Sequence, residues 1–158
     1  MTDPQAEYRY SGARALVELH EHMLRSFLAS WKRAREAELA LPETEDSDYA
    51  SLETLLAHVL RAARGYMTWM CEKLALPDPE IRPAPKPETA AAEADAYLEH
   101  LVERWRLPLR GTPEEAFHRP EHESRWGVRY CIDAMLEHAV MHPLRHRHQL
   151  ETLLAARR

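Results

Sequence analysis

Three histidines near the end of the chain have a spacing that suits metal binding on a helix. His138, His142 and His146 follow one another at intervals of four residues in segment 135–150, MLEHAVMHPLRHRHQL. Residues four apart lie on one helical face, so two neighbouring members of the series can bind one ion. The helix rotates about 40° further at each such step, so all three cannot point at the same ion. Spacing alone leaves open whether His138 or His146 pairs with His142.

A third ligand has to come from elsewhere, and His58 is the best candidate. It lies in segment 52–66, LETLLAHVLRAARGY, where leucines and alanines recur with helical spacing. Neutral imidazole suits several first-row metals, so the residue type selects no single ion. A chain with ten histidines can also produce such a spacing by chance, and histidines at a helix C-terminus are stabilised by the helix dipole. Metal binding is therefore a hypothesis at this point.

Four long amphipathic helices are expected to carry these residues. Strands have little support, because the chain has only four glycines and no alternating run of β-branched residues. Long amphipathic helices joined by loops form bundles, which build metal sites from facing helices. We therefore predict an all-α fold, a four-helix bundle with long crossover loops, as a single domain over residues 1–158. The expected helices span residues 12–39, 49–74, 88–106 and 128–155.

Proline marks the predicted connections. Segment 76–88, LPDPEIRPAPKPE, contains five prolines and is expected to form a stiff crossover loop, because proline donates no backbone hydrogen bond. A second irregular stretch covers 107–127 and includes a short helical turn, with Thr112 as its cap and Pro113 at its first position. Ser47 or Asp48 is expected to cap the second long helix.

Composition narrows the class of protein. The net charge of −5 argues against a general nucleic-acid binder, which needs clustered Lys and Arg. Cys71 and Cys131 are too few and too far apart for a disulfide framework, which fits a reducing compartment. The N-terminal MTDPQAEYRY lacks a signal-peptide pattern, and no run of about 18 apolar residues suggests a membrane span. We expect a cytoplasmic protein.

Taken together, the chain resembles the DinB/YfiT-like metalloenzyme family of four-helix bundles over essentially its whole length. The resemblance rests on the histidine in LLAHVLRAARGY, on the late motif HPLRHRHQL of residues 142–150, and on Trp126-Gly127-Val128 before the last helix. In that family one histidine of the second helix and two of the fourth usually bind a divalent metal. The resemblance implies His58, His142 and His146 as ligands of zinc, nickel, iron or manganese.

Two positions depart from the family pattern. Pro143 stands where an acidic residue is common, and it removes a helix hydrogen bond to the carbonyl of Ala139. The expected kink would re-aim His142 or let His138 compete for the ion. His148 replaces a common glycine and is expected to face solvent.

The resemblance also implies a class of reaction. Three neutral histidines leave the ion its charge and an open position, an arrangement that lowers the pKa of a bound water or thiol. Family members include enzymes that use low-molecular-weight thiols such as bacillithiol, so a thiol S-transferase acting on a small molecule is implied. A hydrolase is the alternative among enzymes, although the sequence places neither Glu137 nor Glu151 near the ion as a general base. A non-catalytic metal-binding or stress-related dimerising bundle is the alternative outside enzymes.

The remaining candidates have weaker roles. His20 falls on the apolar stripe of the first helix and is expected in the core, with a hydrogen bond to a ligand as the alternative. A homodimer is expected because C2 pairing is common and Trp31 and Trp69 would bury surface on a second copy. Four aromatic residues either line a pocket over the metal or belong to the core: Tyr66, Trp69, Trp105 and Trp126.

Overall fold

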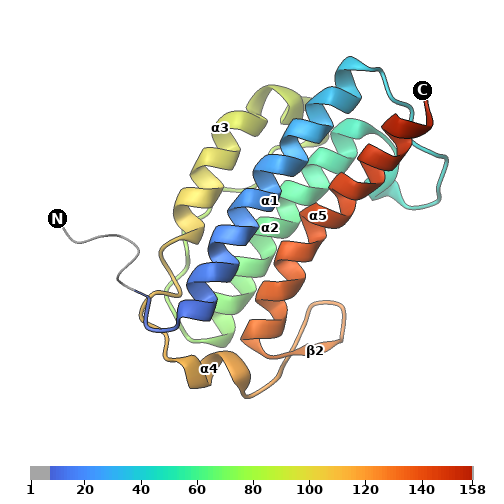
Figure 1. The fold of residues 1–158 in the computed structure, drawn as a ribbon. Helices are drawn as coiled ribbons and strands as arrows, with labels where there is room; N and C mark the ends of the chain where they lie inside the picture. The colour runs from blue at the N-terminus through green and yellow to red at the C-terminus, as the bar shows by residue number, and fades with distance from the viewer. Residues whose placement is uncertain (1–7, 158) are drawn as a thin grey trace.

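Four long helices lie side by side and form most of the molecule (Figure 1). The computed structural model describes residues 8–157, so the N-terminal residues 1–7, on which part of the signal-peptide argument rests, lie outside the described chain. The predicted all-α fold is confirmed. The long helices are α1 (Ser11–Glu36), α2 (Leu52–Lys73), α3 (Pro87–Trp105) and α5 (Ile132–Ala156).

The core between these helices is built from their apolar stripes. α1 packs along α5, α2 packs along α3, and α2 also contacts α5. Two buried tryptophans from neighbouring helices fix α2: the Nε1 of Trp31 donates to the Leu52 carbonyl at 2.6 Å, and that of Trp105 donates to the Ala63 carbonyl at 3.0 Å. Because a buried indole N–H needs an acceptor, these bonds hold α2 against α1 and α3.

The start of α2 differs from the prediction. Neither Ser47 nor Asp48 caps it, because both belong to a short 3-10 helix, η2 (Ser47–Tyr49), whose own cap is Asp46. The cap of α2 is Ser51, whose hydroxyl accepts from the Thr54 N–H at 3.0 Å. The extra turn leaves the side chain of Asp48 free to face α2.

The proline-rich connection between α2 and α3 is a loop, as predicted, and it is anchored to the helices. Ile81 is buried, and its carbonyl accepts from Nε of Arg64 at 2.8 Å. The hydroxyl of Tyr97 donates to the next carbonyl, that of Arg82, at 2.8 Å. Because both helices donate to it, the connection is held along its length.

The connection between α3 and α5 contains more structure than the sequence indicated. After a short helix, α4 (Glu114–His118), comes an antiparallel hairpin of β1 (His122–Glu123) and β2 (Arg129–Tyr130), for which the sequence offered little support. The turn uses Gly127 at φ 85°, a conformation that glycine adopts without strain.

Two helices in this part of the chain, α4 and α5, start at other residues than predicted. Because Val128 belongs to the turn, where its N–H donates to Oγ of Ser124 at 3.1 Å, α5 begins later than predicted, at Ile132. Its cap is Cys131, whose sulfur accepts from the Ala134 N–H. Thr112 does not cap α4, since Pro113 occupies the cap position without a side-chain bond.

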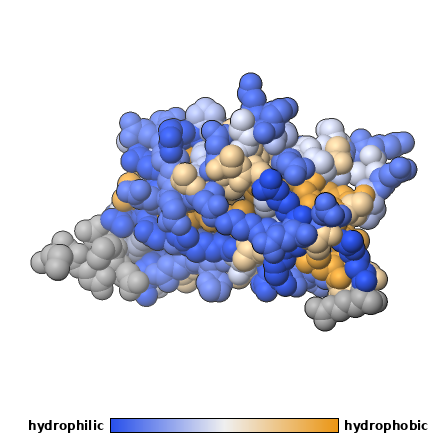
Figure 2. All heavy atoms as spheres, turned by 90° about the horizontal axis from the view of Figure 1, so that it is seen from above, coloured by the Kyte–Doolittle hydropathy of each residue, from blue (hydrophilic) through white to orange (hydrophobic). Residues whose placement is uncertain are grey.

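Hydrophilic residues cover most of the face shown in Figure 2, and hydrophobic residues show between them in patches. This pattern agrees with helices that turn one apolar stripe inward. None of the helices within residues 8–157 is long and apolar enough to cross a membrane.

Candidate metal centre

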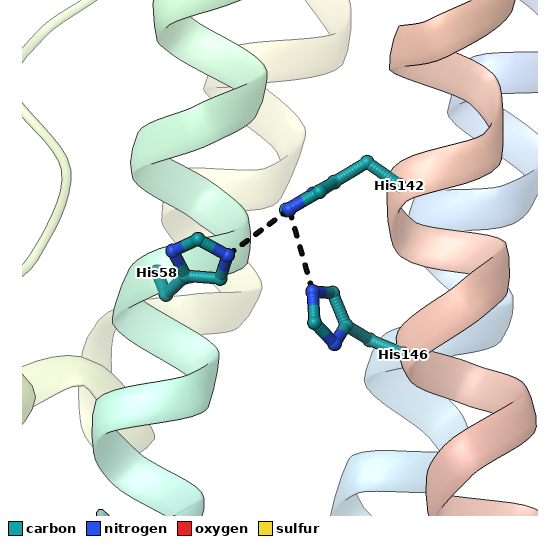
Figure 3. Close-up of side chains that lie close together, drawn as sticks. All are labelled: His58, His142 and His146. Carbon is teal, nitrogen blue, oxygen red and sulfur yellow. Dashed lines mark hydrogen bonds between the residues drawn. The ribbon is translucent and has the colours of Figure 1, made fainter. Parts of the chain in front are cut away.

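Three histidine side chains from two helices converge on one point. Nε2 of His58, on α2, lies 3.0 Å from Nε2 of His142, on α5, and Nε2 of His146 lies 3.3 Å from the same atom (Figure 3). One nitrogen from each histidine lies within 4.8 Å of the other two. These are the three residues that the sequence and the family resemblance brought forward together.

The distances suit a first-row metal ion. Zinc–nitrogen bonds of about 2.0–2.1 Å in tetrahedral geometry place neighbouring ligand atoms about 3.3 Å apart. The measured separations of 3.0 and 3.3 Å agree with this value. Three nitrogens at three corners of a tetrahedron would leave the fourth corner free for another ligand.

The outer nitrogens of two histidines have partners that orient the rings. Nδ1 of His146 bonds to Oε1 of Gln149 at 2.9 Å, and Nδ1 of His58 lies 3.3 Å from Oδ2 of Asp48. An amide or carboxylate oxygen accepts a hydrogen bond, so each contact favours the N–H at Nδ1 and a lone pair at Nε2. Both rings therefore direct a ligating lone pair at the common point.

His142 lies between these two lone pairs. Its Nδ1 is buried with no hydrogen-bond partner in the described chain. A proton on its Nε2 can serve only one of the two neighbouring nitrogens, whereas a cation at the centre interacts with all three. The donor set thus fits a cation better than it fits a hydrogen-bonded trio.

All three imidazoles are held in the neutral form. Burial lowers the pKa of His142 to about 2, and the neighbouring His146 and His58 add to this shift. Burial also lowers the pKa of His58 against the opposing charge of Asp48, and lowers that of His146 against its bond to Gln149. Because a metal binds imidazole only when the ring is neutral, the site is in its binding-competent state at physiological pH.

The three histidines open into a cavity of about 460 Å³. Tyr66, Trp69 and Trp126 line it, with Trp126 about half exposed at the hairpin. Trp105 lies elsewhere, in the core, so three of the four aromatic candidates belong to the cavity. A larger, more apolar cavity of about 520 Å³ shares Tyr49 with this one but holds none of the three histidines.

His138 lines the cavity but stays outside the cluster. Its ring lies against Tyr66 and Trp126, at centroid distances of 5.4 and 5.2 Å. α5 continues through the buried Pro143 without interruption. The predicted competition of His138 for the ion therefore does not appear in the geometry, and His142 is the member that faces His58.

Other histidines are placed away from the site. His20 is buried in the core, where its ring stacks on Trp105 at a centroid distance of 3.7 Å, and neither of its nitrogens has a partner in the described chain. It therefore gives no support to the alternative of a bond to a ligand. His148 is exposed, as expected for a residue turned away from His146.

The cavity offers no free carboxylate as a general base. Asp48 is the single acidic residue that lines it, and Asp48 is engaged with His58 and with Arg61. Glu151 binds the hydroxyl of Ser30 at 2.6 Å and pairs with Arg33, away from the site. Glu137 is exposed. The structure thus agrees with the sequence in placing neither glutamate beside the histidines.

Sequence reasoning missed the two partners of the outer nitrogens. Gln149 follows His146 by three residues on the same helix, so its proximity could have been read from helical spacing. Asp48 gave no such signal, because it reaches His58 from a different element, η2. The spacing of Asp48 and His58 along the chain does not predict their contact.

Comparison with known proteins places the chain in no group. None of the protein-family models, curated proteins or solved structures compared with the chain matches it.

Proposed function

We propose that this protein binds one divalent ion through His58, His142 and His146 and uses it to activate a small thiol for attack on an electrophile. The observation that carries the proposal is the convergence of three Nε2 atoms, with separations of 3.0 and 3.3 Å that suit ligands of one metal ion. The resemblance of the sequence to the DinB/YfiT-like family supports the same ligands and a thiol-dependent reaction.

A bound divalent ion would supply positive charge that lowers the pKa of a thiol or water at the open position. The chain's own residues do the rest. Asp48 and Gln149 hold the rings of His58 and His146, and aromatic side chains line the cavity beside them. In a substitution, the thiolate sulfur would form a bond to the carbon of the electrophile as the bond from that carbon to its leaving group breaks. The leaving group would depart with the electron pair of that bond, and the thiol proton would go to solvent.

The cavity favours a thiol over water as the nucleophile. A free thiol has a pKa near 8.5, whereas water has a pKa of about 15.7, so water needs far more help to lose its proton. Hydrolysis therefore calls for a general base near the open position. The one carboxylate in the cavity, Asp48, is already engaged with His58 and Arg61.

Elemental analysis of protein purified without an affinity tag or chelator, and then given zinc, tests the binding step. The wild type is expected to hold one zinc per chain, and His58→Ala, His142→Ala and His146→Ala are expected to hold much less than one. His138→Ala is the matched control, because it removes a histidine from the same cavity but not from the cluster. A wild type that takes up no zinc, nickel, iron or manganese contradicts the proposal.

A screen of low-molecular-weight thiols with several electrophiles tests the reaction. Activity is expected to need the metal and to be lost in His146→Ala. Activity that persists in that variant would come from another site. Stoichiometric metal without turnover of any thiol or ester in the screen would favour the non-catalytic alternative.

The structure removes one of the two reasons for expecting a homodimer. Trp31 and Trp69 are both buried within the chain, with exposed fractions of 1% and 4%. They therefore offer no apolar surface to a second copy. A dimer remains a prediction from the general frequency of C2 pairing.

A further inference from the structure

The cavity that holds the three histidines is positively charged on an acidic protein. The chain has a net charge of −5. The charged residues other than histidine that line the cavity are Arg61, Arg125 and Arg145, against the single carboxylate of Asp48. A local charge opposite in sign to that of the whole molecule concentrates small anions at the site.

Two of these arginines are free to bind an anion. Arg61 is neutralised by Asp48, with its Nη2 3.0 Å from the carboxylate. Arg125 and Arg145 have neither an ion pair nor a hydrogen bond to any residue in the described chain. An unpaired arginine on a surface is ordinary, but here two of them line one cavity beside a candidate metal centre.

Arg145 is a neighbour of the histidine cluster along α5. It stands between His142 and His146 in α5 and lines the same cavity. A group bound near the open metal position is therefore within the field of this guanidinium.

Arg125 lies further along the cavity. A Cβ placed on Gly65 would come within 3.2 Å of its Nη1, so the absence of a side chain at this glycine lets the guanidinium lie close to α2. Gly65 follows His58 by seven residues, which is a rise of about 10 Å along the helix. Arg145 and Arg125 thus provide two positions at which a negatively charged group can bind, one near the histidine cluster and one further from it.

We propose that the thiol bound in this cavity carries a carboxylate, and that Arg145 binds this carboxylate while the sulfur occupies the open position at the histidine cluster. This inference rests on the proposed function above. A guanidinium pairs with a carboxylate through two parallel hydrogen bonds, which would also fix the orientation of the bound thiol. Arg125 adds a second positive charge that a longer substrate would reach.

Isothermal titration of the zinc-loaded protein with three small thiols tests the proposal. The probes are 3-mercaptopropionate, 2-mercaptoethanol and cysteamine, which place a negative, a neutral and a positive group beside the sulfur. At pH 7.5 we expect 3-mercaptopropionate to bind at least tenfold more tightly than 2-mercaptoethanol, and cysteamine to bind most weakly. Zinc content is measured before and after each titration.

The variant Arg145→Gln is expected to remove the preference for the carboxylate and to keep the zinc. The matched control is Arg147→Gln, because Arg147 lies on the same helix outside the cavity and near Glu151. This control should keep the preference of the wild type.

The outcomes separate this inference from the proposed function. Zinc-loaded protein that binds the three thiols equally well overturns the inference and leaves the metal-activated thiol in place. A preference that survives in Arg145→Gln overturns the assignment of this residue. Failure of the wild type to take up zinc, nickel, iron or manganese overturns both proposals.

Discussion

Each histidine of the cluster has an outer ring nitrogen, Nδ1, that faces away from the common point. The partner of Nδ1 fixes the tautomer of the ring, and the tautomer determines whether Nε2 can bind an ion. The outer nitrogen of His58 contacts an oxygen of Asp48, and that of His146 contacts an oxygen of Gln149. The outer nitrogen of His142 has no partner among residues 8–157. Partners of this kind fix the tautomer and the orientation of a ligating ring, and removing one typically lowers metal affinity by about 10- to 100-fold.

Asp48→Asn should therefore weaken zinc binding by about 10- to 100-fold without abolishing it. Asparagine keeps the size of the side chain but loses the charge that favours a proton on Nδ1 of His58. The measurement is a competition titration against a zinc chelator of known affinity. Arg61→Gln is the control, since it breaks only the Asp48–Arg61 pair; an equal loss in both variants would show that the ion pair, and not the contact with His58, supports the site.

His20 makes the protein sensitive to acid. Burial lowers the pKa of His20 from 6.5 to about 3, so the folded state holds the ring neutral while the unfolded state binds a proton below pH 6.5. Stability is therefore lost as the pH falls from 6.5 towards 3, and by pH 5 this single group costs about 2 kcal/mol.

His20→Phe should flatten the fall in stability between pH 7 and pH 5 by about 2 kcal/mol, because phenylalanine keeps the stack on Trp105 without a titratable group. Urea unfolding of the metal-free protein at each pH measures the change. His22→Ala removes an exposed histidine from the same helix and should retain the slope of the wild type. The same slope in His20→Phe would mean that other groups cause the acid sensitivity.

At the level of single residues, the sequence identified candidate ligands that combine a metal-binding side chain with a helical spacing. His142 and His146 share a helical face, and His58 stood out as polar within an apolar helix. The selection of His146 over His138 as the partner of His142 needed the family resemblance, because helix geometry allowed either. Arg125 and Arg145 gave no signal, since exposed arginines occur throughout the chain and only the fold brings these two to one cavity.

At the scale of elements, α5 carries two of the three histidines on either side of a proline. Pro143 cannot donate a hydrogen bond to the carbonyl of Ala139, yet the helix runs from Ile132 to Ala156. A proline inside a helix costs about 3 kcal/mol relative to alanine, and its loss would also remove some buried contact, because the ring of Pro143 is buried.

Pro143→Ala is accordingly expected to stabilise the protein by about 1–2 kcal/mol, the difference between the restored helix and the lost contacts. Urea unfolding of the metal-free protein measures this gain. Zinc stoichiometry should stay at one per chain, because His142 and His146 remain one helical step apart. A loss of zinc in this variant would show that the proline is needed to aim His142.

The long helices could be predicted because their apolar stripes repeat over many turns, and their observed ends fall within a few residues of the expected ones. The short elements could not. β1 and β2 have two residues each and depend on the turn at Gly127 and on the hydroxyl of Ser124. Such short elements depend on tertiary contacts, and they are too short to show a periodic pattern in the sequence.

At the scale of the whole molecule, the histidine cluster would join two helices that are distant in sequence. His58 belongs to α2, and His142 and His146 belong to α5 (Figures 1 and 3). An ion bound by all three would connect the helices in the folded state alone, because the unfolded chain does not bring these residues together. Binding and folding are then linked.

Zinc should therefore raise the stability of the wild type in a way that depends on its free concentration. At a free zinc concentration one hundred times the Kd, the free energy of unfolding should increase by about 2.7 kcal/mol, and the Tm of a chain of this size should rise by roughly 5–11 °C. Thermal unfolding followed by circular dichroism in zinc-buffered solution measures the shift. His138→Ala should show the same rise and His58→Ala almost none, because only the second variant disconnects α2 from the site. A rise of equal size in His58→Ala would mean that zinc stabilises the fold by binding elsewhere.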